Sequence, residues 1–298
     1  MGGKVSVVVG GQFGSEAKGA VAGYLASTRQ NMSRRTTCVR VGGPNAGHTV
    51  YGRCPVECTD AHIKQRDDKD FENSHPWRLR QIPVAAVTNP NAALVIAAGS
   101  EVDFEVLETE IRQLNSAGYE IGTRLFVDKA ATVLSATHIN AEARHNMNGR
   151  LGSTAKGIGA ARADRVWREA MVVGDITDGF LTDYVVTDTV AMLERGLRMH
   201  AHVVIEGTQG YGLGLHTEFY PMCTSGDTRA IDFLAQAGIS PWAKYIEEFE
   251  VWVVARTRPI RVAGNSGPLK GETSWDALGL EAEKTTVTQR VRRVGEFD

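Results

Sequence analysis

The stretch that decides the fold is residues 5–19, with the sequence VSVVVGGQFGSEAKG. It opens with a run of β-branched residues, which predicts a buried strand over residues 5–9. A glycine-rich turn follows, and the residues after it, up to Leu25, have helical spacing. A strand, a glycine-rich turn and a helix in this order form a phosphate-loop context, because glycines let an anion approach backbone amides at a helix N-terminus. Lys18 would add a compact positive charge.

This loop departs from the two best-known nucleotide-binding patterns. A Walker A loop would need Gly where Ala17 stands and Ser or Thr where Gly19 stands. The G-x-G-x-x-G spacing of a dinucleotide fold is also missing. Taken alone, the segment is therefore equally consistent with a glycine-rich turn that carries a solvated lysine.

The rest of the chain predicts the sheet to which this loop belongs. Short apolar runs at residues 93–97, 125–127, 203–205 and 251–254 alternate with helical segments. The clearest helix begins after Asp103, ends at Gly118 and carries apolar residues on one face. We therefore expect an α/β fold with a large, mainly parallel central sheet flanked by helices, and one domain over residues 1–298. Residues 59–80 are polar and highly charged, which predicts an exposed or mobile loop.

Composition narrows the possible ligands and compartments. The 33 Lys and Arg nearly balance the 35 Asp and Glu, so no broad basic field exists to hold a nucleic acid. A small anion needs only a local cluster, such as the arginines at 290, 292 and 293. The four cysteines form no C-x-x-C pair, and no apolar run reaches the roughly 20 residues that span a bilayer. We expect a cytoplasmic protein with reduced thiols, no membrane partner and no structural metal.

A second glycine-rich segment, GGPNAGHT at residues 42–49, follows the apolar run 38–41. Asn45 can hydrogen-bond a substrate edge, Gly47 can offer a carbonyl oxygen to a metal, and His48 can donate a proton near neutral pH. A structural role for His48 remains the alternative. Because ligands of open α/β sheets bind beyond the carboxyl ends of the strands, both glycine-rich segments are placed for chemistry.

At these segments the chain resembles the adenylosuccinate synthetases, whose loops read G-x-Q-W-G-D-E-G-K-G and G-G-x-N-A-G-H-T. The resemblance continues in order along the chain. GSTAKGIG at 152–159 is similar to G-T-T-G-R-G-I-G-P, EGTQG at 206–210 to E-G-A-Q-G, YPMCTS at 220–225 to Y-P-x-x-T-S, and TQRVRRVG at 288–295 to T-G-R-x-R-R-x-G. VVGD at 172–175 also follows at the expected distance.

The resemblance implies a ligase that moves the γ-phosphoryl group of a nucleotide donor to O6 of a purine monophosphate and then replaces phosphate by the amine of aspartate. Ser15, Lys18 and His48 would be the catalytic residues. Mg²⁺ would be held partly by Ser15 and the Gly47 carbonyl. The resemblance implies that the donor, ATP, dATP or GTP, lies against Gly14, Ser15, Glu16, Ala17, Lys18, Gly19, Gly47, His48 and Thr49.

The same resemblance implies where the two other substrates bind. The acceptor nucleotide would contact Asn45, Ser153, Thr154, Arg168, Gln209 and Thr224, with Arg168 reaching across a homodimer interface to the partner's site. L-Aspartate would be bound by Thr288, Arg290 and Arg292, because the planar guanidinium fork suits carboxylates. A solvated basic turn is the alternative for these arginines.

One departure bears on the substrate: Ser15 stands where the family carries the aspartate that acts as general base toward purine N1 and as a magnesium ligand. A hydroxyl cannot take that proton unaided at neutral pH. Ser15 resembles the phage branch that converts dGMP and aspartate to N6-succino-2-amino-2'-deoxyadenylate, and the smaller side chain leaves room for the guanine 2-amino group. The alternatives are a conventional synthetase acting on IMP, a catalytically inactive nucleotide-binding protein, and a phosphate-loop NTPase.

A second departure lies at the other end. Family members continue beyond the arginine-rich segment into a K-x-D motif that recognises the donor base, and we expect that segment to be absent here. The donor base is therefore not readable from the sequence. Ala17 and Gln289 also replace family glycines, which restricts the backbone of two ligand loops.

Overall fold

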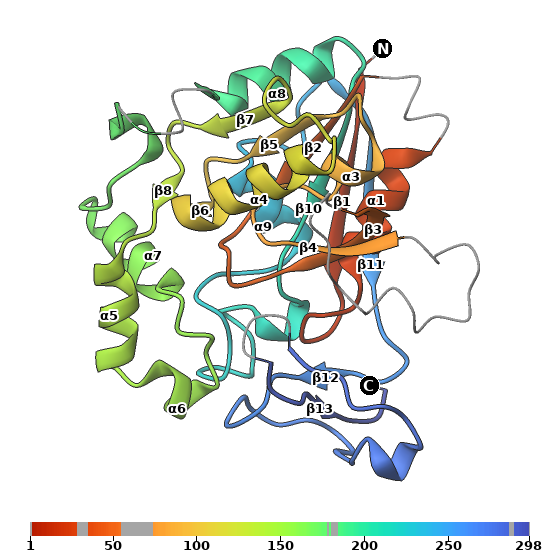
Figure 1. The fold of residues 1–298 in the computed structure, drawn as a ribbon, viewed down its shortest axis with the longest axis vertical. Helices are drawn as coiled ribbons and strands as arrows, with labels where there is room; N and C mark the ends of the chain where they lie inside the picture. Colours follow the sequence, from red (N-terminus) through yellow and green to blue (C-terminus); the bar gives the residue numbers. More distant parts are fainter. Residues whose placement is uncertain are drawn as a thin grey trace.

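The computed structural model describes residues 2–28, 35–54, 74–177, 179, 184–285 and 289–297. Its centre is a seven-stranded sheet in which every neighbouring pair is parallel (Figure 1). Across the sheet the strands are β11 (Ile246–Val254), β1 (Gly3–Gly10), β10 (His202–Glu206), β2 (Thr36–Arg40), β5 (Ala93–Ile96), β7 (Leu125–Asp128) and β9 (Val185–Thr187). The predicted α/β class with a mainly parallel central sheet is confirmed.

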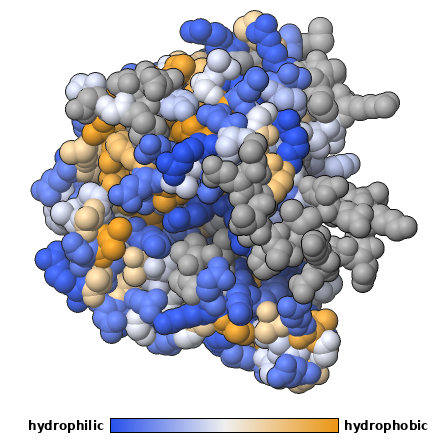
Figure 2. Space-filling model, viewed as in Figure 1, coloured by the Kyte–Doolittle hydropathy of each residue, from blue (hydrophilic) through white to orange (hydrophobic). Residues whose placement is uncertain are grey.

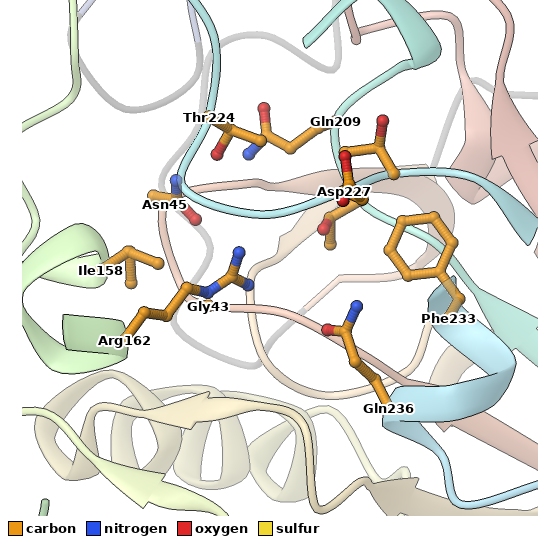
Figure 3. A pocket seen from close by; sticks show the side chains of 11 residues that line it. Gly43, Asn45, Ile158, Arg162, Gln209, Thr224, Asp227, Phe233 and Gln236 are labelled. Atoms are coloured by element: carbon orange, nitrogen blue, oxygen red, sulfur yellow. The ribbon is translucent and has the colours of Figure 1, made fainter. Parts of the chain in front are cut away.

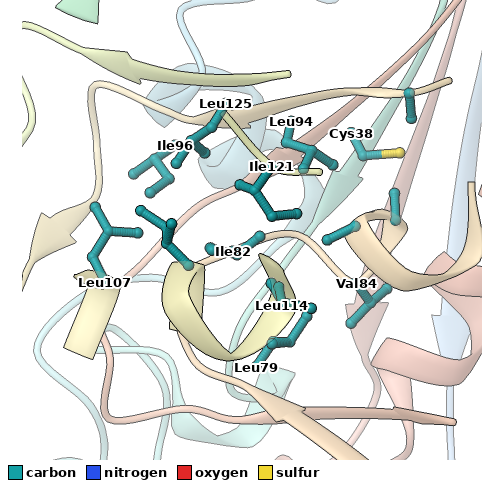
Figure 4. Close-up of a cluster of buried hydrophobic side chains, with 14 of the residues drawn as sticks. Cys38, Leu79, Ile82, Val84, Leu94, Ile96, Leu107, Leu114, Ile121 and Leu125 are labelled. Atoms are coloured by element: carbon teal, nitrogen blue, oxygen red, sulfur yellow. The ribbon is translucent and has the colours of Figure 1, made fainter. Parts of the chain in front are cut away.

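Helices cover both faces of this sheet because its strands are apolar on both sides. On one face lie α1 (Lys18–Ser27), α3 (Ala85–Thr88) and α4 (Phe104–Ser116), and their apolar residues join Leu94 and Ile96 of β5 in the larger buried cluster (Figure 4). On the other face, α8 (Thr189–Arg198) and α9 (Ala230–Gln236) pack on Val5 and Val7 of β1.

Helix α4 forms where the sequence predicts it. The Asp103 side chain accepts hydrogen bonds from the backbone N–H groups of Glu105 and Val106 at 3.1 and 3.2 Å, which satisfies two donors at the helix start. Its apolar stripe includes Leu107 and Leu114, both fully buried. Burying a leucine side chain contributes about 1.5–3 kcal/mol, so this stripe anchors the helix to the sheet.

A side layer projects from the sheet where the chain carries α5 (Ala136–Arg144), α6 (Met147–Leu151) and α7 (Ile158–Trp167) (Figure 1). Short elements complete the fold. They are the strand pairs β6 (Glu101–Val102) with β8 (Thr132–Val133) and β12 (Ile260–Arg261) with β13 (Arg293–Val294), and the 3₁₀ turns η3 (Val173–Asp175), η5 (Tyr211–Leu213) and η6 (Asp276–Leu278). Within the described ranges, none of the helices has the length and apolar character needed to cross a bilayer.

The prediction of a loop over residues 59–80 is wrong for residues 74–79. Residues Ser74–Leu79 form β4, which pairs antiparallel with β3 (His48–Arg53). Trp77 and Leu79 are each 2% exposed while Arg78 between them is exposed, so the alternation typical of a half-buried strand is present but too short to detect beside the charged run. Residues 59–73 lie outside the described residues.

The central strands end at one edge of the sheet, and this edge positions the site. Arg40 is the last residue of β2 and Glu206 the last residue of β10, and the two are register partners. Gly10 ends the neighbouring strand β1. The loops that follow these strands carry the predicted ligand-binding motifs.

Candidate active site

A cleft of about 1150 Å³ lies beyond this edge of the sheet. Five residues from five separate segments line it, namely Lys18, His48, Thr154, Gln209 and Arg290. Ten more of the predicted residues also line it: Gly14, Ser15, Ala17, Gly19, Asn45, Gly47, Thr49, Ser153, Thr224 and Arg292. The structure therefore brings together motifs that lie up to about 280 residues apart in the sequence.

Three predicted residues are not among those lining the cleft. Glu16 is buried beneath the first loop, and Thr288 lies outside the described residues. Arg168 ends helix α7 with φ of 67°, and its guanidinium donates to the Val166 carbonyl at 2.7 Å. Val166 and Trp167 beside it are 67% and 73% exposed. Figure 2 shows apolar surface on the side of the molecule where Figure 1 draws α5 and α7. Arg168 is itself exposed and is not among the residues that line the cleft of its own chain.

The first loop adopts left-handed backbone at Gly14, Ser15 and Ala17, with φ of 88°, 61° and 71°. Glycine takes this conformation without strain, and among the other residues Asn and Asp tolerate it best. The third of these residues is the N-cap of α1 and has no side chain that could cap the helix. The first-turn amides of α1 therefore depend on a ligand or solvent, as at other anion-binding helix starts.

Positive φ angles also explain where the resembling motifs carry glycine. Ala17, Ala155 and Gln289 replace glycine in the three motifs, and their φ angles are 71°, 49° and 55°. The backbone of the ligand loops has kept its left-handed turns although the residue that favours them has been replaced.

The loop is held from below by Glu16, whose carboxylate is completely buried. One oxygen accepts from the backbone N–H groups of Gln12 and Gly14 at 3.2 and 2.8 Å. The other accepts from Nζ of Lys18 at 2.6 Å. Burial lowers the pKa of Lys18, and the Glu16 carboxylate opposes that shift. Glu16 was expected against the donor nucleotide, whereas its contacts here are to the loop itself.

His48 lines the cleft but is only 6% exposed, because two charged residues lie against its Nδ1 atom. Arg40 places NH1 at 2.5 Å and Glu206 places Oε2 at 3.0 Å from that nitrogen. Burial, with the nearby charges of Arg40 and Lys18, holds the pKa of His48 well below its ordinary value. Burial also raises the pKa of Glu206 to about 7, against the pull of Arg40.

Sequence reasoning missed Arg40 and Glu206 as parts of the site. Each is a charged residue at the end of an apolar run, CVR at 38–40 and VVIE at 203–206. Such a residue normally marks the point where a strand reaches solvent, yet both side chains are 1% exposed. The signal that could have found them is that two predicted strands of a parallel sheet each end in a charged residue, and that the two charges are opposite.

Ser15 lies at the mouth of the first loop beside two arginines. Its hydroxyl is hydrogen-bonded by NH1 of Arg292, and its carbonyl accepts from NH1 of Arg256 at 3.2 Å. Arg256 is in turn paired with Glu283, so the arginine-rich segment closes onto the first loop. Arg256 and Glu283 were not predicted from the sequence, since neither belongs to a recognisable motif.

The acceptor side of the cleft is formed by Asn45, Gln209 and Thr224, which also border a smaller polar pocket with Arg162 and Asp227 (Figure 3). The loop carrying Gln209 packs tightly on the first loop. A Cβ atom at Gly210 would lie 2.5 Å from the Gly14 nitrogen, so only glycine allows the loops after β1 and β10 to meet.

The residues proposed for Mg²⁺ fit that ion in part. The Gly47 carbonyl and the Ser15 hydroxyl are oxygen donors that line one cleft, and Mg²⁺ often takes only one or two protein ligands besides phosphates and water. The Ser15 hydroxyl, however, already accepts from Arg292. Among the described residues, no group of three or more His, Cys, Asp or Glu side chains is arranged to hold a metal.

Comparison with known proteins adds relatives over the whole chain. Residues 7–184 and 180–298 match the adenylosuccinate synthetase family. An adenylosuccinate synthetase of Thermococcus sibiricus is 34% identical over 295 residues, covering 98% of this chain and 77% of the relative. The N6-succino-2-amino-2'-deoxyadenylate synthase of Vibrio phage phiVC8 is 33% identical over 309 residues, covering 98% and 79%.

A solved structure also resembles the fold. The succinoaminodeoxyadenylate synthetase PurZ of cyanophage S-2L, bound to dGMP and dATP as an energy donor, superposes with a TM-score of 0.78 at 28% identity. It covers 99% of this chain and 79% of the cyanophage chain. Adenylosuccinate synthetase from Plasmodium falciparum, at 22% identity and a TM-score of 0.76, shares the fold.

Proposed function

Because this chain belongs to the adenylosuccinate synthetase family and is a ligase that forms a C–N bond, we propose that it condenses L-aspartate with a purine nucleoside monophosphate. We propose dGMP as the favoured acceptor. The observation that carries the choice of acceptor is Ser15, which lines the cleft where the family has an aspartate. The phage relative and the PurZ structure support it, while conventional synthetases are equally similar in sequence.

The proposed reaction has two steps. In the first, O6 of the acceptor attacks the γ-phosphorus of ATP, dATP or GTP, the bond from that phosphorus to the β,γ-bridging oxygen breaks, and the proton on purine N1 is released. In the second, the amine of aspartate attacks C6, the C6–O6 bond breaks, phosphate leaves with O6, and the amine nitrogen loses a proton to solvent. The product is N6-succino-2-amino-2'-deoxyadenylate when the acceptor is dGMP.

The protein's part in this reaction is to position charge. Lys18 and the backbone of the first loop lie against the donor phosphates, and His48 hydrogen-bonds the transferring group, whose charge is shared over its oxygens. Mg²⁺, held in part by the Gly47 carbonyl, neutralises phosphate charge when it is bound. Arg290 and Arg292 bind the carboxylates of aspartate, which requires Arg292 to leave the Ser15 hydroxyl when substrates enter.

Ser15 is the residue that we expect to select the purine. No carboxylate stands at this position to accept the N1 proton, and we propose that a water held at the Ser15 hydroxyl accepts it. The φ angle of 61° at Ser15 is one that aspartate also tolerates, so the position can be changed to a carboxylate without distorting the loop. This makes the residue a clean target for a test.

The test compares dGMP with IMP in an assay of aspartate-dependent phosphate release. We expect the protein to use dGMP and Ser15→Asp to shift preference toward IMP, while the matched variant Ser15→Ala keeps the original preference. Wild-type preference for IMP would identify a conventional synthetase. Hydrolysis that is independent of aspartate would identify an NTPase, and binding without turnover would identify an inactive nucleotide-binding protein.

We also propose that two copies form the functional unit. Arg168 is displayed on the surface next to the exposed Trp167, which suits a residue that completes the acceptor site of a second copy. Sedimentation should show a dimer, and Arg168→Ala should raise the KM for the acceptor much more than the KM for the donor. A monomer with an unaltered acceptor KM in Arg168→Ala would contradict this arrangement.

A further inference from the structure

We propose that Arg40 is a positioning residue that fixes the tautomer of His48, so that Nε2 carries the proton and acts as a hydrogen-bond donor to the reacting phosphoryl group. Arg40 does so through its contact of 2.5 Å with Nδ1. Glu206 holds Arg40 in place and provides the competing partner for the same nitrogen. The inference about activity rests on the proposed function, whereas the inference about the tautomer does not.

The donor groups of Arg40 determine which tautomer of His48 can bind them. A guanidinium group has five N–H donors and no acceptor, so Arg40 can bond to Nδ1 only if that nitrogen presents its lone pair. The proton of a neutral imidazole must then be on Nε2. In the described part of the chain Nε2 of His48 has no hydrogen-bond partner, and His48 lines the cleft, so this donor is left for a ligand.

Glu206 favours the opposite tautomer of His48. A carboxylate oxygen at 3.0 Å could accept a proton from Nδ1, and the ring would then present a lone pair at Nε2. Nδ1 cannot satisfy both residues at once. Arg40 lies nearer, and its NH1 atom also lies 3.5 Å from the Glu206 carboxylate, which draws the negative charge into an ion pair.

The two side chains that compete for Nδ1, Arg40 and Glu206, are both held in place by other hydrogen bonds. Arg40 also donates through NH2 to the carbonyls of Ala46 and Arg80, at 2.5 and 3.3 Å. The second oxygen of Glu206 accepts from the backbone N–H of Val84 at 2.8 Å. Both side chains stand at the ends of paired strands and are 1% exposed. The guanidinium therefore cannot swing away from the ring without breaking its other hydrogen bonds.

The test is a second-site rescue. In Arg40→Met, studied at a pH above the raised pKa of Glu206 so that its carboxyl is ionised, the nearest partner of Nδ1 becomes a carboxylate. The His48 proton should then move to Nδ1, and the donor in the cleft is lost. Removing one such donor from a reacting oxygen typically lowers kcat about 10²–10³-fold. In the double variant Arg40→Met with Glu206→Gln, the amide can donate to Nδ1 and keep its bond to Val84. We expect it to restore the Nε2–H tautomer and to recover kcat at least tenfold over Arg40→Met.

Two readouts distinguish this role from a merely structural one. Nitrogen-15 NMR of the imidazole rings, assigned with His48→Gln, reports the tautomer without any turnover. Steady-state kinetics should show kcat lowered while the acceptor KM changes less than about threefold. The control is Arg124→Met, which removes another arginine that bonds to backbone carbonyls, those of Asn89 and Tyr119. Neither of these residues is a hydrogen-bond partner of His48, so the tautomer should stay unchanged.

The proposal is overturned if His48 carries its proton on Nδ1 in the unmodified protein, or if Arg40→Met leaves the tautomer as it was. It is also overturned if Arg40→Met keeps the kcat of the unmodified protein although the double variant restores the tautomer. Absence of ligase activity in the unmodified protein would instead count against the proposed function, and the NMR result would still decide the tautomer.

Discussion

Glu16→Gln is the substitution that tests how the first loop is held. The carboxylate is fully buried and the Lys18 ammonium beside it is 3% exposed, at a distance of 2.6 Å. Glutamine keeps the volume and one acceptor for the amides of Gln12 and Gly14, so the change isolates the charge pair. Breaking a buried pair by removing one partner costs about 3–5 kcal/mol, because the other charge stays buried. Deprotonation of Lys18 limits the loss, so we expect the lower end, about 3 kcal/mol.

Urea unfolding, followed by circular dichroism, measures this loss. The double variant Glu16→Gln with Lys18→Met contains no unpaired charge and should recover about 2 kcal/mol relative to Glu16→Gln alone. The exposed i,i+4 pair of Glu194 with Arg198 provides the control, and Glu194→Gln should cost less than about 0.5 kcal/mol. A loss below about 1 kcal/mol in Glu16→Gln, or a double variant as unstable as the sum of its parts, would refute the reasoning.

Three further results are expected. Ala17→Gly should raise the unfolding free energy by about 0.5–1 kcal/mol in urea titration, because the left-handed backbone at φ of 71° strains alanine; no gain would show that the loop relaxes. His48→Ala should lower kcat strongly with a smaller effect on acceptor binding, and equal losses in both would identify His48 as structural. Hydrogen bonds from Lys4 lower the pKa of Glu250 to about 2, so the pair stabilises the fold above pH 4.5 and this contribution falls as the pH drops toward 2. The unfolding free energy of Lys4→Met should therefore differ most from that of the unmodified protein at neutral pH. A difference that grows as the pH falls would contradict this.

Much of the sheet was predictable because its inner strands, such as β1, β5 and β10, are buried on both faces and contain apolar runs. Strand β1 and the helix after Asp103 were found this way. Strand β4 was not, because its alternation spans only a few residues and follows a highly charged segment. Local sequence could not show the partner strand that stabilises such a short strand, since β3 lies more than 20 residues upstream.

The residues of the candidate site that belong to sequence motifs were predictable. Those that are brought together only by contacts between distant parts of the chain were not. Lys18, His48 and Gln209 stand in recognisable loops and line the cleft. Arg40 and Glu206 meet across 166 residues of sequence, so nothing near either residue indicates that its charge is buried. The contact of Ser15 with Arg292 joins two motifs that were identified separately, and only the folded chain brings them together.

The place of β1 in the sheet has a consequence during synthesis. Its two neighbours, β10 and β11, come from the last third of the chain, with residues such as Val8 and Trp252 paired across the register. At about 5–20 residues per second, roughly 12–50 s pass between translation of β1 and completion of β11. Strand β1, whose four valines are buried in the folded protein, therefore stays without its two sheet neighbours until β10 and β11 have been translated, and during that time it offers an apolar segment that a chaperone can cover.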